Sequence, residues 1–485
     1  MKLYNTLSRK IEEFEPLEKG KAGIYICGPT VYDYSHIGHA RTYVNSDVLI
    51  RVLKWLDYDV KSVMNITDVG HLTDDADEGE DKMEKKARAE KKTAEEIADF
   101  YTKDFWQMSK MMNINKPDVI CKATEYIKEM IELIKKLEEK GFVYKISDGM
   151  YFDTSKLKDY GKLARLDIEG LKEGARVEKK LEKKNPTDFA LWKFSYLKGR
   201  SFDVAQDDSA SRRQMEWDSP WGVGFPGWHI ECSVMSMKHL GESFDIHTGG
   251  VDHIPVHHTN EIAQSEAVTG KPFVKYWFHN GFLMVEGEKM SKSLKNFLRV
   301  EDIKKKGFDP LVLRYLFLSG HYRTKMNFTW KGLEAADEGY KKLKSIVSEW
   351  GGVKSRTSLS EEKLQKLQGS TLKFRQAVEN DLAMPQAMAV VWEMVKSNIP
   401  EQDKWELIQD WDRVLGLDLG QITNNKLQMT NNKLQITNEV EELVKKREEL
   451  RKEKKYDEAD EIKKQVEEKG FKMEDTVEGT VVKLK

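Results

Sequence analysis

The alternation of apolar and polar residues predicts strands and helices in turn over the first part of the chain. Residues 23–31 form a short apolar strand pattern, and residues 59–66 (DVKSVMNI) form a second one. Between them we expect a helix with Ser35 as its N-cap. This helix runs through apolar residues at helical spacing: Val44, Val48, Val52 and Trp55. The β-α-β order predicts a parallel sheet.

The middle of the chain is more polar. Charged helix patterns fill residues 76–140, residues 141–152 (GFVYKISDGMYF) predict a hairpin, and the region to about 215 is irregular. We interpret residues 121–215 as an insertion that connects two halves of the sheet. The second half predicts four elements: a helix at 227–240, a strand at 244–247, a helix from about residue 256 and a strand at 282–285.

Beyond residue 325 the pattern becomes helical and predicts a bundle. Its apolar stripe contains these residues: Leu372, Val378, Leu382, Ala389, Val390 and Met394. Two segments differ in composition, residues 201–214 and residues 423–438, and both predict loops outside the working parts of the chain. The second repeats TNNKLQ, which predicts either disorder or an exposed loop. After them, residues 444–466 predict a charged amphipathic helix, and GFKMEDTVEGTVVK predicts a small terminal hairpin.

Composition narrows the class of protein. A chain of 485 residues suggests three or four domains. It has no run of about 18 apolar residues and no apolar signal segment at its start, so we expect a cytoplasmic protein without membrane spans. Three cysteines cannot form a disulfide framework. Because the net charge is only −2, a nucleic acid would have to be held by local basic patches.

Two short motifs are suited to phosphate chemistry. The helix after the first strand begins with the letters HIGH, and its N-terminus carries partial positive charge and unpaired N–H groups. His36 and His39 beside Gly38 are therefore suited to hold and neutralise a triphosphate. Lys289 and Lys292 belong to a KMSKS sequence, where ammonium groups could clamp a leaving pyrophosphate. Either motif alone also fits an ordinary surface turn or a basic loop.

Histidines are concentrated in one part of the chain. Seven of the eleven fall between residues 229 and 279, which indicates a site there. His257 and Glu261 are four residues apart and share one helix face, whereas His258 is expected to point elsewhere. Imidazole and carboxylate groups at this spacing are typical of a zinc site.

Two cysteines complete the predicted ligand set. Cys27 ends the first strand beside the HIGH helix, and Cys232 lies in the predicted helix 227–240. Since sites in parallel sheets lie at the carboxyl ends of strands, a metal there would lie beside the nucleotide pocket. The alternative interpretation treats both as buried small hydrophobic residues, which is what we expect of Cys121.

These motifs, in this order and at this separation, resemble class I aminoacyl-tRNA synthetases, and most closely the cysteinyl-tRNA synthetase family. The resemblance extends over nearly the whole chain. It is carried by CGPTVYDYSHIGHART, NITDV, LWKF, SPWGVGFPGWHIECS, FDIHTGGVDHIPVHHTNEIAQSE, KMSKSLKNF, EADEIKK and GFKMEDTVEGT. Two departures are Val256, where the family usually has proline, and Thr259, which replaces a glutamate.

The resemblance implies a reaction and its ligands. The fold would be α/β, with a Rossmann-like parallel-sheet catalytic domain. It would use ATP with Mg2+ to make cysteinyl-adenylate and then esterify tRNA(Cys), as a monomer. It also implies one Zn2+ per chain, with four ligands: Cys27, Cys232, His257 and Glu261. Zinc prefers thiolate to hydroxyl, so it could reject serine, which apolar contacts discriminate by only about 10- to 200-fold.

The resemblance also assigns the remaining site residues. The cysteine pocket would be completed by Thr67, Trp228 and His247. ATP would be bound by seven residues: His36, Gly38, His39, Gly249, Gly250, Asp252 and Lys292. Catalysis would depend on His36, His39, Lys289 and Lys292. Contacts with tRNA phosphates are expected from Arg299, Lys304, Lys305, Lys306 and Arg323.

The implied division of the chain follows the same match. The catalytic domain would occupy residues 1–120 and 216–290, with the insertion at 121–215. The parts that follow are a KMSKS loop and stem-contact region at 291–330, an anticodon-binding bundle at 331–422, the repeat loop at 423–438 and a helix with a hairpin at 439–485.

Two other functions remain open from the residues. One is a cysteine-adenylating ligase with a non-tRNA amine acceptor, although such relatives are shorter at the C-terminus. The other is a non-catalytic RNA-binding paralogue, against which the intact motifs and ligand set argue.

Overall fold

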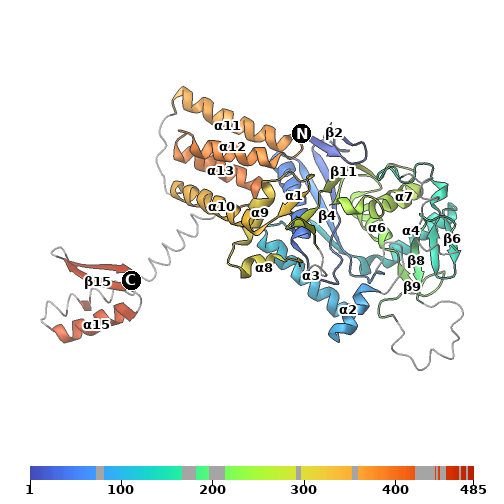
Figure 1. Cartoon of the computed structure of the whole chain (residues 1–485), viewed down its shortest axis with the longest axis horizontal. Coiled ribbons are helices and arrows are strands. Elements are labelled where there is room, and N and C mark those ends of the chain that lie inside the picture. The colour runs from blue at the N-terminus through green and yellow to red at the C-terminus, as the bar shows by residue number, and fades with distance from the viewer. Residues whose placement is uncertain are drawn as a thin grey trace. The chain divides into compact units, whose positions relative to one another are not determined.

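The computed structural model describes most of the chain in two compact units (Figure 1). The described residues are 1–72, 81–166, 182–195, 213–290, 296–351, 359–420, 443, 446, 447, 450, 455–468, 471–476 and 479–484. The first unit comprises Met1–Leu343 and Arg356–Leu417, and the second Lys344–Ser355 and Asp418–Lys485. In the described part of the chain, every helix is too short or too polar to span a bilayer.

A five-stranded parallel sheet forms the centre of the first unit. Its spatial order is β11-β10-β3-β4-β5, and every pairing is parallel. The strands are β3 (Lys21–Ile26), β4 (Asp59–Ile66), β5 (Val119–Lys122), β10 (Phe244–Gly250) and β11 (Val274–Asn280). The predicted α/β class and parallel sheet are confirmed, and β4 has its predicted bounds. The two outer strands, β5 and β11, were not predicted.

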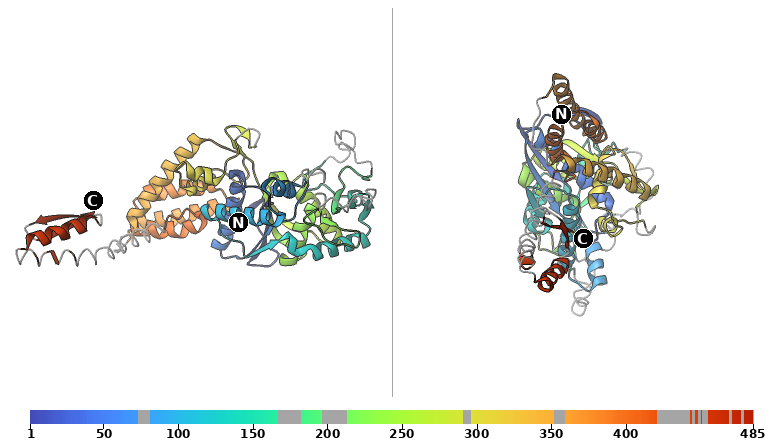
Figure 2. Two further views of the ribbon diagram at one scale, coloured as in Figure 1. Left: turned by 90° about the horizontal axis from the view of Figure 1, so that it is seen from below. Right: turned by 90° about the vertical axis from the view of Figure 1, so that its left-hand side faces the viewer.

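Helices cover both faces of this sheet (Figure 1 and Figure 2). On one side, Tyr25 of β3 and Val63 of β4 pack against Ile230 of α6 (Trp228–Leu240). Successive strand residues face opposite sides, so Ile24 points to the other face, which α1 (Ile37–Trp55) covers. Helices α7 (His257–Thr269) and α4 (Ile127–Glu139) both contact α6.

The start of α1 differs from the prediction. His36, and not Ser35, is the N-cap, because Nδ1 of His36 accepts a hydrogen bond from the backbone N–H of His39 at 3.1 Å. The side chain of His39 in turn accepts from the backbone N–H of His36 at 3.4 Å, which completes a capping box. The first histidine of HIGH therefore starts the helix as well as belonging to the motif.

A second, antiparallel sheet contains the predicted hairpin. Its order is β6-β7-β8-β9, with β6 (Val143–Ile146), β7 (Gly149–Phe152), β8 (Phe189–Phe194) and β9 (Gly224–Pro226). The hairpin β6-β7 is confirmed, whereas β8 lies in a region that was expected to be irregular. Most of the segment 201–214 lies outside the described residues.

The smaller elements of the first unit connect these layers. The strands are β1 (Lys2–Asn5), β2 (Lys10–Glu13), β12 (Leu283–Val285), β13 (Glu288–Lys289) and β14 (Met326–Phe328). The helices are α2 (Lys82–Glu90), α3 (Ala94–Met111), α8 (Val300–Lys305) and α9 (Pro310–Leu318). The predicted strand at 282–285 is β12.

The predicted helical bundle is present after residue 325. Its helices are α10 (Trp330–Trp350), α11 (Glu361–Glu379), α12 (Met384–Lys396) and α13 (Glu401–Leu415). The predicted apolar stripe was wrong in part, because Leu372 is 55% exposed and Ala389 is exposed. The chain leaves the helix at Asp381 and Leu382, whose φ angles are 54° and 52°, so one helical stripe does not continue from α11 into α12. Three stripe residues are buried: Val378, Leu382 and Met394.

The second unit contains α15 (Tyr456–Glu468) and a hairpin. Strands β15 (Phe471–Thr476) and β16 (Gly479–Leu484) pair in antiparallel fashion, which confirms the predicted terminal hairpin. The repeat at 423–438 lies outside the described residues.

Candidate metal and nucleotide site

Four of the predicted site residues lie at the carboxyl ends of three neighbouring parallel strands. Cys27 follows β3, Thr67 follows β4, and Gly249 and Gly250 end β10. Helices α1, α6 and α7 begin at this same edge. In parallel sheets this edge is where ligands bind, since the loops that follow the strands meet there.

Three of the predicted zinc ligands converge in the interior. The side chains of Cys27, Cys232 and His257 are buried, and their ligand atoms all lie within 4.8 Å of one another. Cys27 comes from the end of β3, Cys232 from α6 and His257 from the first turn of α7. The cluster therefore joins the sheet to two helices that pack on it.

Glu261 lies against the same cluster. Its Oε1 is 3.0 Å from Nε2 of His257, and its Oε2 is 2.9 Å from Nε2 of His247. Burial would raise the pKa of Glu261, but His247 and His257 outweigh burial and lower it to about 2. Burial would likewise lower the pKa of His257, but Glu261 and Cys27 raise it to about 10. Glu261 is therefore an anion that its imidazole neighbours stabilise.

His258 was predicted to point away from the cluster, but its side chain lies beside it. Its Nε2 lies 3.9 Å from Oε1 of Glu261, and its ligand atom also groups with those of Cys27 and His253. Its Nδ1 is 2.7 Å from Nε2 of His279. The helical spacing of residues 257 and 261 was read correctly, but a side chain in the first turn of a buried helix also meets neighbours from β10 and β11.

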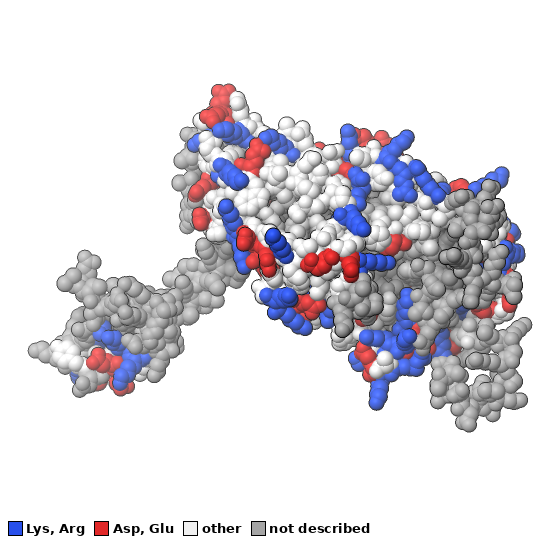
Figure 3. Space-filling view, viewed as in Figure 1, with Lys and Arg blue, Asp and Glu red and all other residues white. Residues whose placement is uncertain are grey.

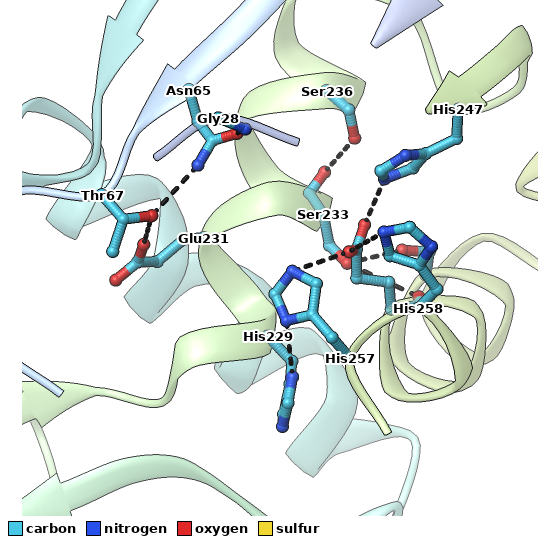
Figure 4. Close-up of polar contacts among 12 residues, drawn as sticks. Gly28, Asn65, Thr67, His229, Glu231, Ser233, Ser236, His247, His257 and His258 are labelled. Carbon is cyan, nitrogen blue, oxygen red and sulfur yellow. Dashed lines mark hydrogen bonds and ion pairs between the residues drawn. The ribbon is translucent and has the colours of Figure 1, made fainter. Parts of the chain in front are cut away.

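The donor set fits Zn2+. Nε2 of His257 and Oε1 of Glu261 are buried and make no hydrogen bond with any described group, although they lie close together. A hydrogen bond from Cys232 lowers the pKa of Cys27, and that same bond raises the pKa of Cys232. Two thiols, an imidazole and a carboxylate are the ligands that zinc prefers. Nδ1 of His229 lies 3.0 Å from Nδ1 of His257 and so orients that ring (Figure 4).

A cavity of about 200 Å3 lies beside the cluster. Residues from both predicted pockets line it, including His39, Trp228 and Asp252. The ring of Trp228 is 4.3 Å from that of His257. His247 is fully buried and stacks on Trp277, so it reaches the site through Glu261. Two of the three residues predicted for the cysteine pocket, Trp228 and His247, thus lie next to the cluster, and Trp228 lines the cavity.

Two residues of this region were not singled out from the sequence. Glu231 is fully buried, accepts a hydrogen bond from Thr67 at 2.9 Å and lies 2.6 Å from His71. His71 lines the cavity. No local pattern marks Glu231 in the sequence, since its partners lie more than 150 residues away. Its position directly before Cys232 was the one signal available.

The two histidines of HIGH stack on each other at the start of α1. Their ring centroids are 3.7 Å apart and their planes differ by 10°. Burial lowers the pKa of His36 to about 4, so its ring is neutral at pH 7. The backbone N–H of Ile37 donates to the carbonyl of Leu298 at 2.9 Å, and that of His39 to His36. Two amides of the helix start are therefore already engaged, and the histidines offer hydrogen bonds rather than charge.

Glycines allow close packing around these rings. A side chain at Gly38 would meet the His36 ring at 2.9 Å, and one at Gly249 would meet His258 at 2.5 Å. At Gly250 such a side chain would collide with a carboxylate oxygen of Asp252. In the described structure the space that these glycines leave is filled by neighbouring side chains, which keeps the histidines close to the sheet edge.

The KMSKS segment begins next to the HIGH helix. Lys289 is exposed, and the methyl group of Met290 lies 3.6 Å from the position that a side chain at Gly38 would take. Lys292 lies outside the described residues. After the motif, Arg299 pairs with Asp104 at 2.7 Å and lies 3.5 Å above the ring of Tyr34. This packing ties the end of the segment to the start of α1.

Two arginines that were expected to meet tRNA phosphates have partners within the protein. Arg299 pairs with Asp104, and Nε of Arg323 donates to the buried carboxylate of Asp381 at 2.8 Å. Lys306 lies 3.9 Å over the ring of Trp330. On the face drawn in Figure 3, basic and acidic residues are interspersed. This distribution agrees with the near-neutral net charge of the chain.

Comparison with known proteins identifies the family. The model described as "tRNA synthetases class I (C) catalytic domain" matches residues 13–338. The chain is 45% identical over 492 residues to a cysteine–tRNA ligase of Treponema denticola, with 98% of each chain covered. It is also 45% identical over 480 residues to cysteine–tRNA ligase 1 of Burkholderia lata, with 98% of this chain and 95% of that one covered.

Solved structures share the fold at low sequence identity. A ternary complex of Agrobacterium radiobacter LeuRS with tRNA and LeuAMS has a TM-score of 0.60 at 12% identity, with 85% of each chain covered. Mycobacterium tuberculosis methionyl-tRNA synthetase with methionyl-adenylate has a TM-score of 0.56 at 14% identity, with 83% of this chain and 90% of that one covered. The class I fold is thus matched in structure as well as in sequence. The chain belongs to the cysteine–tRNA ligase family of class I tRNA synthetases.

Proposed function

We propose that this cysteine–tRNA ligase recognises L-cysteine with one Zn2+ per chain, forms cysteinyl-adenylate from ATP and transfers the cysteinyl group to tRNA(Cys). The observation that carries the proposal is the convergence of Cys27, Cys232 and His257 beside the cavity, with Glu261 against them. Relatives matched over 98% of this chain are named for the ligation of cysteine to tRNA.

The metal site would select the amino acid. Zn2+ held by Cys27, Cys232, His257 and Glu261 supplies a soft Lewis acid that prefers the thiol of cysteine to the hydroxyl of serine. His247 holds Oε2 of Glu261, so the orientation of that carboxylate is set before any ligand arrives. Thr67 and Trp228 would complete the cysteine pocket.

The nucleotide would bind between the HIGH helix and the end of β10. His36 and His39 would donate hydrogen bonds to the phosphates of ATP, and Gly38 keeps the two rings in contact. Gly249, Gly250 and Asp252 would contact the nucleoside.

The lysines of the KMSKS motif would stabilise the negative charge of the leaving group. Lys289 and Lys292 would stabilise the pyrophosphate, together with the Mg2+ that accompanies ATP. The carboxylate of cysteine attacks the α-phosphorus, and the protein supplies positioning and hydrogen bonds rather than a covalent group. Its residues therefore act by holding reactants in line.

The organisation of the chain is proposed on the same basis. Residues 1–120 and 216–290 would form the catalytic domain, 121–215 its insertion, 291–330 the stem-contact region, 331–422 the anticodon-binding bundle and 439–485 a terminal unit after the loop at 423–438. We propose that the enzyme acts as a cytoplasmic monomer. Light scattering of the purified chain tests the oligomeric state.

Pyrophosphate exchange tests the function. With ATP and each amino acid in turn, cysteine should support exchange without tRNA, and its advantage over serine should exceed the roughly 200-fold that apolar contacts provide. Charging of tRNA(Cys) should follow on its addition. Equal exchange with serine, or zinc-free protein of full activity, would overturn the proposal, and transfer to a free amine instead of tRNA would favour the alternative acceptor.

A further inference from the structure

The carboxylate of Glu231 is a buried group to which the proposed function gives no role. It lies in α6 directly before Cys232, and its side chain is 0% exposed. Adjacent helix residues point about 100° apart, so Glu231 faces away from the metal cluster and toward the end of β4. There its Oε2 accepts a hydrogen bond from Oγ1 of Thr67 at 2.9 Å (Figure 4).

A chain of hydrogen bonds fixes the direction of the Thr67 hydroxyl. Oδ1 of Asn65 accepts from the backbone N–H of Gly28 at 2.7 Å, so its amide nitrogen must face the other way. That nitrogen donates to Oγ1 of Thr67 at 3.0 Å. The carboxylate of Glu231 can only accept, so the single hydroxyl proton of Thr67 points at Glu231.

This arrangement leaves Thr67 as an acceptor only. A hydroxyl has one proton and two lone pairs, and here the proton and one lone pair are already used. The remaining lone pair can accept a hydrogen bond from an ammonium group but cannot donate one to a carboxylate. The negative charge of Glu231, next to this hydroxyl, also attracts an ammonium group and repels a carboxylate.

The cavity lies on the other side of Glu231. Nε2 of His71 is 2.6 Å from Oε1 of Glu231, neither atom makes an aligned hydrogen bond with a described group, and His71 lines the cavity. Glu231 is thus separated from the cavity by one side chain, that of His71.

We propose that Glu231 is a positioning residue that sets the orientation of the substrate zwitterion. By holding the Thr67 hydroxyl as an acceptor, it directs the α-ammonium of cysteine toward Thr67 and the carboxylate away from it, toward the nucleotide. The inference rests on the proposed function, since it takes Thr67 to be part of the cysteine pocket.

Two cysteine analogues separate this role from a general effect on the pocket. Cysteamine has the thiol and the ammonium group but no carboxylate, and 3-mercaptopropionate has the thiol and the carboxylate but no ammonium group. Binding of each to zinc-loaded full-length protein is measured by calorimetry, for the wild type and for Glu231→Gln. The substitution keeps the shape of the side chain and removes its charge.

The expected pattern is selective. Glu231→Gln should weaken the binding of cysteine and of cysteamine about tenfold or more, because both carry the ammonium group. The binding of 3-mercaptopropionate, which lacks that group, should stay unchanged. Thr67→Val should show the same selectivity, and the double variant should lose no more than either single variant, because Glu231 acts through Thr67. Thr67→Ser, which keeps the hydroxyl, should bind like the wild type.

Other outcomes would overturn the inference. A role of Glu231 through Thr67 would be contradicted if Glu231→Gln weakened the binding of all three ligands equally or left cysteamine binding unchanged. It would also be contradicted if the losses of binding free energy were additive in the double variant. Zinc content equal to that of the wild type confirms that each variant keeps its metal cluster. A wild-type chain without zinc, or without preference for thiols, would instead refute the proposed function, so the two failures are distinguishable.

Discussion

Arg314 and Asp47 form an ion pair in the interior of the first unit, with Nη2 of Arg314 2.7 Å from Oδ2 of Asp47. Asp47 belongs to α1 and Arg314 to α9. The same guanidinium donates to the carbonyl oxygens of Leu415, after which α13 ends, and of Met112, after α3. One buried arginine therefore ties the HIGH helix to the helical bundle.

Arg314→Met should destabilise the protein strongly. Loss of the guanidinium leaves Asp47 buried with fewer partners, and breaking a buried pair in this way costs about 3–5 kcal/mol of unfolding free energy. The matched control is Arg375→Ala, which removes an exposed pair with Glu379 on α11 and should cost about 0.5 kcal/mol. Urea unfolding measures both, and equal midpoints would contradict the assignment.

Cys232→Ser should lose zinc and cysteine activation while the fold stays largely intact. Serine is a poor zinc ligand, and the remaining three groups bind the metal more weakly. Cys121→Ser is the control, because burial raises the pKa of the Cys121 thiol to about 12 and its sulfur donates to the carbonyl of Met64. Elemental analysis of the purified variants decides the matter, and wild-type metal content in Cys232→Ser would exclude this ligand.

His36 should make folding stability depend on pH. The folded protein keeps this imidazole neutral down to a pKa of about 4, whereas the unfolded chain takes up the proton near the usual value of 6.5. Unfolding between these values binds a proton, so stability falls as the pH drops through this window. His36→Gln should therefore lose less stability between pH 7 and pH 5 than the wild type. Parallel stability curves for the two proteins would argue against the lowered pKa.

Lys292→Ala should slow adenylate formation with little loss of cysteine affinity. The ammonium group is expected to act on charge that develops on the pyrophosphate, which is absent from the ground state. Lys325→Ala, at an exposed lysine outside the motif, serves as control. Single-turnover formation of the adenylate provides the rate, and an unchanged rate in Lys292→Ala would remove this residue from the catalytic set.

Arg299→Ala should also slow adenylation, although Arg299 lies after the KMSKS motif. Its contacts with Asp104 and Tyr34 hold the segment that follows the motif against the start of α1. Arg299→Lys should show an intermediate rate, because lysine keeps the charge but cannot stack its planar group or bind bidentately. If the alanine variant changed charging of tRNA alone, the residue would act on the nucleic acid instead.

The fold was predictable where burial alternates or where helical spacing is regular. Strand β4 was found because its pattern is apolar and ends at a turn, and the hairpin β6-β7 for the same reason. Strand β11 was missed because it is buried along nearly its whole length and contains His279 and Asn280, which look polar in sequence. Strand β5 has only four residues, too few for a pattern.

Candidate site residues could be found in the sequence where they lie within a few positions of one another. HIGH, KMSKS and the spacing of His257 and Glu261 are visible within short windows of sequence. The contacts of Glu231 and His258 could not be predicted, because both depend on side chains that are distant in the sequence and that the fold brings beside them. The break between α11 and α12 was missed because two non-glycine residues adopt positive φ angles there, against their usual preference.

Helix α1 begins with the stacked histidines and ends against the bundle, where Nε1 of Trp55 donates to Asp410 at 3.0 Å and its ring meets Phe374 edge-on. Its 19 residues span about 28 Å, and a helix resists compression along its axis. The separation between the histidine pair and the bundle is consequently constant. A displacement of the bundle end of α1 along the helix axis would therefore displace the histidine pair by a similar distance.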